Sequence, residues 1–243
     1  MNEFTLNNPS FIQNVNDSAI VTNGLVIHLD FGNPKSYIGG SNIKNLGTKG
    51  GTASLVNSPT FSASNGGYIS FNGTSQYISS QTLGFNTSAG FTVCLFYKQI
   101  NPQGQAFWNY FWSTGTGGGN QKEMGSYSNS RFLFKDNFTV SSVLSDDVTT
   151  DWTYIAMGTN SSAVPFVYTY NRTGSFFSDS ASPKFATNTV MDFETFFHTG
   201  TGGGVGGSTF YKANCAIIHA YNRELSSAEL TKNFNALKGR FGY

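Results

Sequence analysis

The chain has 243 residues, of which only 11% are charged, and its formal net charge is +1. Because this balance builds no basic field, nucleic acid and anionic membranes are excluded as expected partners. Aromatic residues make up 16% of the chain and glycine contributes 28 residues, a composition typical of β-structure with many turns.

Residues 1–22 show no sustained hydrophobic period and are rich in asparagine. We predict an N-terminal arm over 1–22, followed by one folded domain over 23–243. The arm contains no cationic segment leading into an apolar run, and nothing in the chain approaches the roughly 18 apolar residues of a membrane helix. The chain is therefore expected to be soluble and unprocessed.

The first strand is predicted in "GLVIHLDF", where apolar and polar residues alternate. This alternation predicts a half-buried strand. The residues expected to face the core are Leu25, Ile27, Leu29 and Phe31, and those expected on the other face are Val26, His28 and Asp30.

Several further segments have strand patterns. "FTVCLFYK" (91–98) is apolar on both faces, as expected of a central strand, and Asn72-Gly73 in "GGYISFNGTSQYISS" indicates a two-residue hairpin. "WTYIAMGT", "PFVYTYNRTGSFF" and "CAIIHAY" supply more strands. Because no helical periods separate them, we predict an all-β, antiparallel two-sheet sandwich.

Two smaller features lie within these strands. Cys94 and Cys215 each sit in an apolar run, which favours buried free thiols over a disulfide. "FWSTGTGGG" (111–119) and "FFHTGTGGG" (196–204) both lead from an aromatic strand into a glycine loop. We expect these loops to be neighbours at one end of the sandwich.

The closing segment is the one clear helix. Ser226 as N-cap with Glu229 three residues later forms a capping box, and Leu225 before the cap can pack on Leu230. The helix is predicted over about 227–238, lying flat on the sandwich, with Gly239 just beyond its end. Its apolar stripe consists of Leu230, Phe234 and Leu237.

The terminal "YNRELSSAEL" and "FNALKGRFGY", preceded by "GLVIHLDFGNPKSY", "GGYISFNGTSQYI" and "FTVCLFYK", carry a resemblance. They resemble the concanavalin A-like lectin/glucanase superfamily in its LamG-like branch, above all the copies found in bacteriophage and other virion proteins. The likeness runs from about residue 24 to the end and is looser over 100–190. It implies a jelly-roll sandwich and a glycan-binding or particle-decorating role.

The hydrolases of that superfamily use a strand motif of the form Glu-x-Asp-x-Glu, which places two carboxylates on one face of the cleft. The comparable stretch here is "VMDFE", where Asp192 and Glu194 fill the second and third places but Val190 stands at the nucleophile's place. We expect no enzyme activity, and we interpret the two carboxylates as part of a solvated strand face.

The histidines give no catalytic pattern either. His28, His198 and His219 are scattered and no Gly-x-Ser-x-Gly elbow is present, so no nucleophile triad is predicted. His219 shares a strand face with apolar neighbours, which favours a hydrogen-bonded core or half-buried histidine.

Metal and cofactor sites are not predicted. No cluster has zinc spacing, and where relatives tend to read "FDGT" this chain has Asn72, which lowers the charge of a calcium site. We expect no cofactor, with calcium as a less favoured alternative.

A glycan site is suggested by the aromatic "QAFWNYFW" and the later "GSYSNSRF". Sugars are held by aromatic faces with a few aimed polar groups, and the i, i+2, i+4 spacing of the first three residues predicts one shared face. The alternative is that this face is simply core. The candidate residues are Trp108, Tyr110, Trp112, Tyr127, Asn129 and Arg131.

The resemblance favours a non-enzymatic structural protein on the virion surface, made in the host cytoplasm. It would be a capsid decoration or a fibre- or tail-associated lectin-like module, multicopy or homo-oligomeric, contacting other virion proteins and binding host or environmental glycans. The alternatives are a soluble lectin and a laminarinase-type hydrolase. The arm residues expected to attach the module to the particle are Phe4, Leu6, Phe11 and Ile12.

Overall fold

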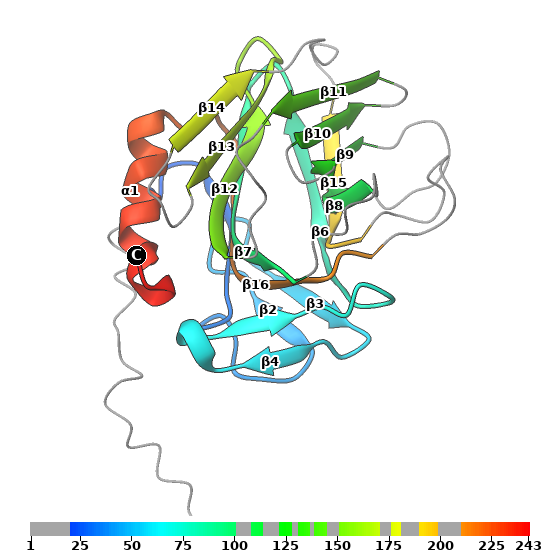
Figure 1. Ribbon diagram of the computed structural model, residues 1–243, viewed down its shortest axis with the longest axis vertical. Coiled ribbons are helices and arrows are strands. Elements are labelled where there is room, and N and C mark those ends of the chain that lie inside the picture. Colours follow the sequence, from blue (N-terminus) through cyan, green and yellow to red (C-terminus); the bar gives the residue numbers. More distant parts are fainter. Residues whose placement is uncertain are drawn as a thin grey trace, which may run out of the picture.

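The protein is described by a computed structural model that covers residues 20–100, 108–113, 122–127, 131–136, 139–144, 151–170, 176–180, 190–198 and 210–243. Within these ranges the chain forms sixteen strands and one α-helix. Figure 1 shows two stacked sheets, with the helix lying against one of them. The predicted all-β antiparallel sandwich of jelly-roll type with a single C-terminal helix is confirmed.

The sheet that the helix covers, called here the covered sheet, has the order β14-β13-β12-β7-β16-β5-β4, and β1 also pairs with β16. Its strands are β1 (Leu25–Asp30), β4 (Thr60–Ser62), β5 (Tyr68–Ser70), β7 (Phe91–Gln99), β12 (Trp152–Thr159), β13 (Pro165–Tyr170), β14 (Phe176–Ser180) and β16 (Ala213–Tyr221).

The other sheet, called the distal sheet, has the order β11-β10-β9-β8-β15-β6-β3-β2. Its strands are β2 (Asn42–Lys44), β3 (Thr52–Val56), β6 (Tyr77–Asn86), β8 (Trp108–Ser113), β9 (Lys122–Tyr127), β10 (Arg131–Asp136), β11 (Thr139–Leu144) and β15 (Val190–Phe196). The helices are the 3-10 helices η2 (Ser64–Gly66) and η3 (Lys238–Phe241) and the α-helix α1 (Ser227–Leu237).

Strand β7 shows how two apolar layers arise from one sequence. Its odd-numbered residues, such as Leu95, join the core between the sheets, whereas Cys94 and Phe96 join a second cluster on the helix side. Strands that are buried on both faces read as continuous apolar runs. The central position predicted for 91–98 is confirmed, since β7 lies between β12 and β16.

Strand β1 differs from its prediction because both of its faces are covered. Ile27 and Leu29 face the core between the sheets as expected, but His28 and Asp30 are only 4% and 0% exposed. The C-terminal segment lies over this second face, since Arg240 of η3 binds the Asp30 carboxylate. The strand is therefore buried on both faces rather than half-buried, with Val26 partly exposed.

The hairpin predicted at Asn72-Gly73 is wrong. β5 and β6, on either side of it, belong to different sheets, so the turn crosses the edge of the sandwich. The local turn chemistry is nonetheless real: Gly73 has φ of +72°, and the Asn72 side-chain oxygen accepts hydrogen bonds from the amides of Thr74, Ser75 and Gln76. A tight turn can serve a crossover as well as a hairpin.

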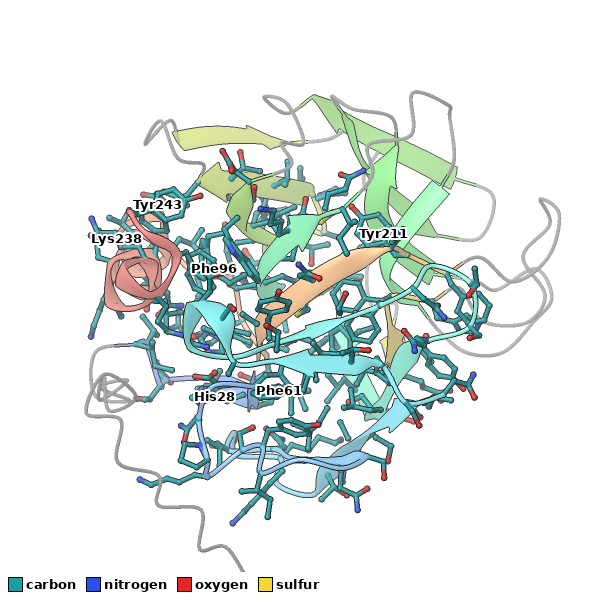
Figure 2. All side chains as sticks on the ribbon, turned by 60° about the horizontal axis from the view of Figure 1, so that its bottom comes forward. His28, Phe61, Phe96, Tyr211, Lys238 and Tyr243 are labelled. Atoms are coloured by element: carbon teal, nitrogen blue, oxygen red, sulfur yellow. The ribbon has the colours of Figure 1, made fainter. Side chains whose placement is uncertain are left out.

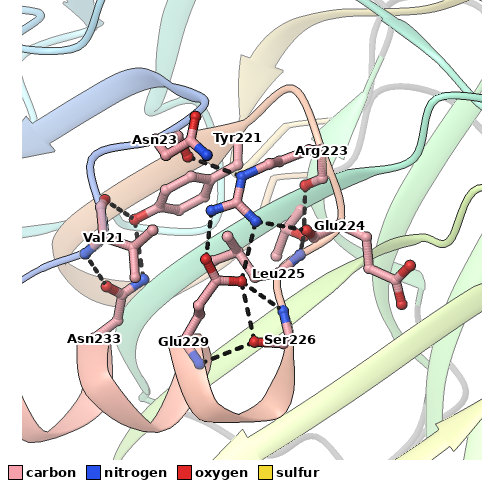
Figure 3. Close-up of polar contacts among 10 residues, drawn as sticks. Val21, Asn23, Tyr221, Arg223, Glu224, Leu225, Ser226, Glu229 and Asn233 are labelled. Atoms are coloured by element: carbon pink, nitrogen blue, oxygen red, sulfur yellow. Dashed lines mark hydrogen bonds and ion pairs between the residues drawn. The ribbon is translucent and has the colours of Figure 1, made fainter.

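The helix start is confirmed in detail (Figure 3). The Ser226 hydroxyl accepts from the Glu229 amide, and the Glu229 carboxylate accepts from the Ser226 amide at 2.9 Å. Arg223 donates two hydrogen bonds to the same carboxylate, at 2.6 and 3.0 Å. The Arg223 guanidinium and these amide and hydroxyl donors lower the pKa of Glu229 to about 2 against the opposing effect of burial.

The predicted apolar stripe is buried, together with Asn233. Phe234 stacks on Tyr170 with ring centroids 4.5 Å apart, so α1 lies on the outer face of the covered sheet. The helix ends at Leu237, within one residue of the predicted end, but the expected role of Gly239 is wrong: the chain continues into η3, and Gly242 rather than Gly239 adopts the left-handed conformation, with φ of +80°.

The domain begins earlier than the predicted boundary at residue 23. Ile20 and Val21 are 3% and 5% exposed and pack in the helix-side cluster. The Val21 amide donates to the Asn233 side chain at 2.7 Å, and its carbonyl accepts from the Tyr221 hydroxyl at 3.0 Å. Residues 1–19 of the expected arm, including all four predicted attachment residues, lie outside the described residues.

The cysteines are buried and free, as predicted. Cys94 lies in the helix-side cluster and Cys215 in the core between the sheets. Burial raises the pKa of Cys94 to about 12 and raises that of Cys215 further, so both thiols stay protonated at neutral pH.

Candidate functional site

The predicted glycan site falls on β8, β9 and β10, three neighbouring strands of the distal sheet. In the β8–β9 ladder Trp108 is paired with Tyr127, and Tyr110 with Gly125. Directly opposite residues share a face of a sheet, so these positions form one row. For these strands the structure describes the backbone register, and Asn129 lies outside the described residues.

Trp112 does not belong to that row, which corrects the prediction of one shared face. The β8–β9 ladder has a bulge between Tyr110 and Trp112, and Trp112 pairs with Met124 on β9 and with Phe196 on β15. Met124 and Phe196 are 1% and 0% exposed and belong to the core between the sheets. A bulge inserts one residue and so changes the face of the positions beyond it.

The remaining row therefore lies on the outer face of the distal sheet. Met124 faces the core, and its neighbour Gly125 is on the opposite face because side chains alternate along a strand. On β10, Phe132 pairs with Ser126, which brings the preceding Arg131 next to Tyr127. The outer row thus runs across three strands through Trp108, Tyr127 and Arg131.

The charged positions of β10 differ in their neighbours. Lys135 is paired with Glu123 in the β9–β10 ladder. Arg131 is paired on its other side with Leu144 of β11, which carries no charge.

The two strands that lead into the glycine loops are hydrogen-bonded neighbours. β8 and β15 pair through Ser113 with Thr195 and Trp112 with Phe196. The loops that follow, at 114–119 and 199–204, lie outside the described residues. The pairing places the last residues before both loops at one point of the distal sheet.

The carboxylate motif lies on β15, beside β6. Asp192 pairs with Gly84, and a register irregularity follows between Phe193 and Thr195. The Glu194 carboxylate, which is partly exposed, accepts a hydrogen bond from the Thr82 hydroxyl at 3.0 Å. Val190, at the place of the hydrolase nucleophile, is 48% exposed.

The histidines are more deeply buried than the sequence suggested. His219 is fully buried, and neither of its ring nitrogens has a hydrogen-bond partner in the part of the chain that the structure describes, so the hydrogen-bonded alternative is wrong. Its ring packs edge-on against His28. His198, at the rim, is stacked between Tyr77 and Phe210, with ring centroids 4.7 and 4.5 Å away.

A second polar group, which sequence reasoning missed, lies between the covered sheet and the C-terminal segment. His28, His219, Asp30 and Arg240 meet there. The signal was present in the sequence as His28 and Asp30 at alternate positions of β1 and as the single His219 in an apolar stretch of β16. Alternation alone assigns such residues to a solvent face.

No group of three or more histidine, cysteine, aspartate or glutamate side chains able to hold a metal ion occurs in the described ranges. At Asn72 the side-chain oxygen is bound to three backbone amides of its own turn. An oxygen engaged by amide donors is not turned toward a cation. The Asn72 side-chain oxygen thus stabilises its own turn.

Among the described residues, no helix has the length and apolar character needed to span a membrane.

Comparison with known proteins identifies the fold. No family model matches the chain, and no curated protein matches it. Solved structures do match. Domain 4 of AbnA, a GH43 extracellular arabinanase from Geobacillus stearothermophilus, has a TM-score of 0.63 at 13% identity, over 89% of this chain and 100% of that domain.

Two other similar structures belong to larger chains. Trypanosoma rangeli sialidase has a TM-score of 0.59 at 16% identity, over 90% of this chain and 34% of the sialidase. The botulinum neurotoxin serotype D/C binding domain has a TM-score of 0.62 at 12% identity, over 88% of this chain and 52% of that chain. The chain thus spans about a third of the sialidase and about half of the toxin structure. At these identities the likeness shows a shared β-sandwich fold of jelly-roll type.

Proposed function

We propose that the chain is a non-enzymatic, virion-displayed recognition module that binds glycans through the outer face of the distal sheet. The observation that carries the proposal is the row of Trp108, Tyr127 and Arg131 across three paired strands. Aromatic rings stack on the apolar faces of sugars, and convergent polar groups fix their orientation.

The arginine in this row favours acidic sugars. A guanidinium binds a carboxylate through two parallel hydrogen bonds, and the ladder partner of Arg131 on β11 is the uncharged Leu144. The glycan class we propose therefore carries a carboxylate or sulfate group.

Similar solved structures support a binding role, but we do not assign their ligands to this chain. The arabinanase domain was solved with arabinotriose, and a related toxin binding domain was solved with rat synaptotagmin II. A valine at the nucleophile's place supports a module without glycosidase activity, since a hydrocarbon side chain cannot form a glycosyl-enzyme. A laminarinase-type hydrolase remains the competing enzyme hypothesis.

Glycan binding is tested on an array with the full chain and three variants. Trp108→Ala should weaken binding by roughly thirtyfold, about 2 kcal/mol, as truncation of a central aromatic contact does. Arg131→Gln should reduce binding to acidic glycans more than to neutral ones. Phe61→Ala is the matched control, because Phe61 is 43% exposed on β4 of the other sheet.

The outcomes separate the hypotheses. Loss with Trp108→Ala and retention with Phe61→Ala supports the outer row. Equal losses in both variants, or no binding by the full chain, contradicts it. Turnover of a β-glucan that is lost in Glu194→Gln would instead support the hydrolase.

Display on a virion rests on the resemblance of the terminal segments and on the polar arm that precedes the domain. Other virion proteins would hold the module in multiple copies on the particle surface. An antibody raised against the domain should label intact particles of the virus that encodes the chain. Particles that lack the chain would favour the alternative of a free lectin.

A further inference from the structure

One end of the molecule carries positive charge without acidic residues. Residues 31–121 contain four lysines and no aspartate or glutamate, and they include β2, β3 and β4, which lie together at the lower end of Figure 1. The exposed lysines of this end are Lys35, Lys44 and Lys49, and among the described residues none of them forms an ion pair. The net charge of +1 for the whole chain therefore does not describe this end.

The loop between β1 and β2 brings two of these lysines together. The Lys44 amide donates to the Ser36 carbonyl, and the Ser36 hydroxyl donates to the Lys44 carbonyl, both at 2.8 Å. The backbone of Lys35, next to Ser36, therefore lies beside that of Lys44. Lys49 follows in the turn between β2 and β3. The three lysines thus belong to one short part of the fold, fixed by backbone contacts.

The same loop exposes an apolar side chain. Ile38 is 88% exposed, although its neighbour Tyr37 is buried and donates from its hydroxyl to the Gly40 carbonyl at 3.0 Å. Gly39 and Gly40 have φ of +105° and +81°, and no described atom lies within 4 Å of the position that a Cβ would take at either residue. Ile38 therefore lies at the tip of a closed loop that projects into solvent.

Phe61 extends this apolar surface onto β4. Its ring centroid lies 5.5 Å from that of Tyr37, and it is 43% exposed. Figure 2 turns this end of the molecule toward the reader and labels Phe61. Among the described strands β4 is the last of the covered sheet and pairs only with β5, so its other edge offers backbone groups to a strand from another chain. We define the basic edge surface as Lys35, Ile38, Lys44, Lys49 and Phe61.

The first 19 residues of the chain have the complementary chemistry. Their charged side chains are those of Glu3 and Asp17, and they contain no lysine, arginine or histidine. The four apolar residues already named as attachment residues all lie between these two acids. An acidic, apolar segment matches a basic, apolar surface in both charge and hydrophobicity.

We propose that the arm of one copy docks on the basic edge surface of a neighbouring copy, so that copies of the chain associate head to tail. Arm and surface are two different patches of one chain, as a heterologous interface requires. A symmetric contact between two basic edge surfaces is disfavoured, because it brings their lysines face to face without an acid between them.

The arm and the surface lie at different places on the domain. Val21, just after the arm, is bound by Asn233 of α1 and by Tyr221 on the helix side of the covered sheet, whereas β2 and β4 are the last strands of the two sheets. One copy can therefore receive an arm and extend its own at the same time. Nineteen extended residues span up to about 60 Å, which is enough to reach a neighbouring copy.

Self-association of the full chain tests the proposal. Sedimentation velocity at increasing protein concentration should show dimers and larger species. Raising the sodium chloride concentration from about 50 to about 500 mM should weaken the association, because salt screens charges between exposed groups. This readout does not depend on glycan binding.

Two variants of the full chain each remove one side of the contact. The surface variant carries Lys35→Gln, Lys44→Gln and Lys49→Gln. The arm variant carries Phe4→Ser, Leu6→Ser, Phe11→Ser and Ile12→Ser. Alone, each variant should associate about tenfold or more weakly than the unchanged chain, since three charge contacts or several buried apolar side chains are lost.

A mixture of the two variants distinguishes docking on a neighbour from docking within one copy. The surface variant keeps an intact arm, and the arm variant keeps an intact basic edge surface. An equal mixture should therefore form a one-to-one dimer that neither variant forms alone, and no larger species, because only one contact can be made.

Matched substitutions elsewhere on the domain provide controls. Ile38→Ser should weaken association about tenfold, whereas Val190→Ser, at a residue 48% exposed on β15, should not change it. Lys232→Gln, at an exposed position of α1, is the control for the lysine substitutions and should also leave association unchanged.

Three results would overturn the proposal. The first is a full chain that stays monomeric at every concentration. The second is a mixture of the two variants that contains only monomers, which indicates that the arm binds its own domain or another protein. The third is self-association that persists at full strength in the surface variant, which places the contact elsewhere on the domain.

Discussion

The buried ion pair between Arg240 and Asp30 joins residues 210 positions apart in the chain. Their side chains are 6% and 0% exposed. Arg240 also donates to the carbonyls of Gly66 and Gly67, so one guanidinium ties η3 to β1 and to the segment after η2. Arg223 and Glu229 form a comparable contact, but at 27% and 31% exposure.

These two arginines should differ in their effect on stability. Arg240→Leu leaves the Asp30 charge buried without its partner, which costs about 3–5 kcal/mol. Arg223→Leu breaks a solvent-screened pair and should cost about 1 kcal/mol or less. Chemical denaturation of both variants gives the two free energies of unfolding.

A double variant checks the reason for that difference. Asp30→Asn combined with Arg240→Leu should recover part of the loss, because no uncompensated charge remains. Equal losses in the free energy of unfolding for Arg240→Leu and Arg223→Leu would show that burial of the Asp30–Arg240 ion pair has no effect on stability.

At the scale of helices and strands, the correct predictions depend on residues that are close together in the chain. The capping box of α1 involves two residues that are three positions apart. The burial of β7 on both faces can be predicted from the apolar sequence of the strand itself. Strand pairing is not local. The Asn72-Gly73 turn has hairpin chemistry, yet β5 does not pair with β6 beyond it; its partners are β4 and β16, the latter far along the chain.

The prediction that three aromatic residues of β8 share one face misses the bulge for the same reason. A spacing of i, i+2, i+4 places three aromatic residues on one face only in an unbroken strand. The bulge that places the Trp112 position on the core face arises from pairing with β9 and β15. The sequence of β8 alone carries no information about these partners. Likewise, His28 reads as surface because the segment that buries it lies near the other end of the chain.

The helix cap gives a prediction at this scale. Ser226→Ala removes the hydroxyl that accepts from the Glu229 amide and should lower the free energy of unfolding by about 1 kcal/mol. Ser227→Ala, one residue into the helix at an exposed position, should change it little. Thermal unfolding of both variants under identical conditions makes the comparison, and similar melting temperatures would contradict a stabilising cap.

In the whole molecule, the two outer faces of the sandwich differ in what covers them. Residues of the C-terminal segment 227–243, together with Ile20 and Val21, pack on the outer face of the covered sheet, and Figure 1 places α1 on the opposite side of the sandwich from β8, β9 and β10.

The position of the domain boundary decides how the arm is tested. Removing 1–22 would delete Ile20 and Val21 and leave the buried polar groups of Asn233 and Tyr221 without the backbone partners that Val21 supplies. Each buried apolar side chain is worth about 1.5–3 kcal/mol, and each orphaned polar group costs about 1–3 kcal/mol. Such a truncation would fail for reasons of folding.

Removing 1–19 should instead leave the melting temperature within about 2 °C of the full chain, because no described contact is lost, and surface changes are usually small. If the arm attaches the module, this folded truncation should be missing from assembled particles, as should the full chain with Phe4, Leu6, Phe11 and Ile12 all replaced by serine. Quantitative mass spectrometry of purified particles measures the occupancy. Normal occupancy of the 1–19 truncation would show that the particle holds the module through the folded domain instead.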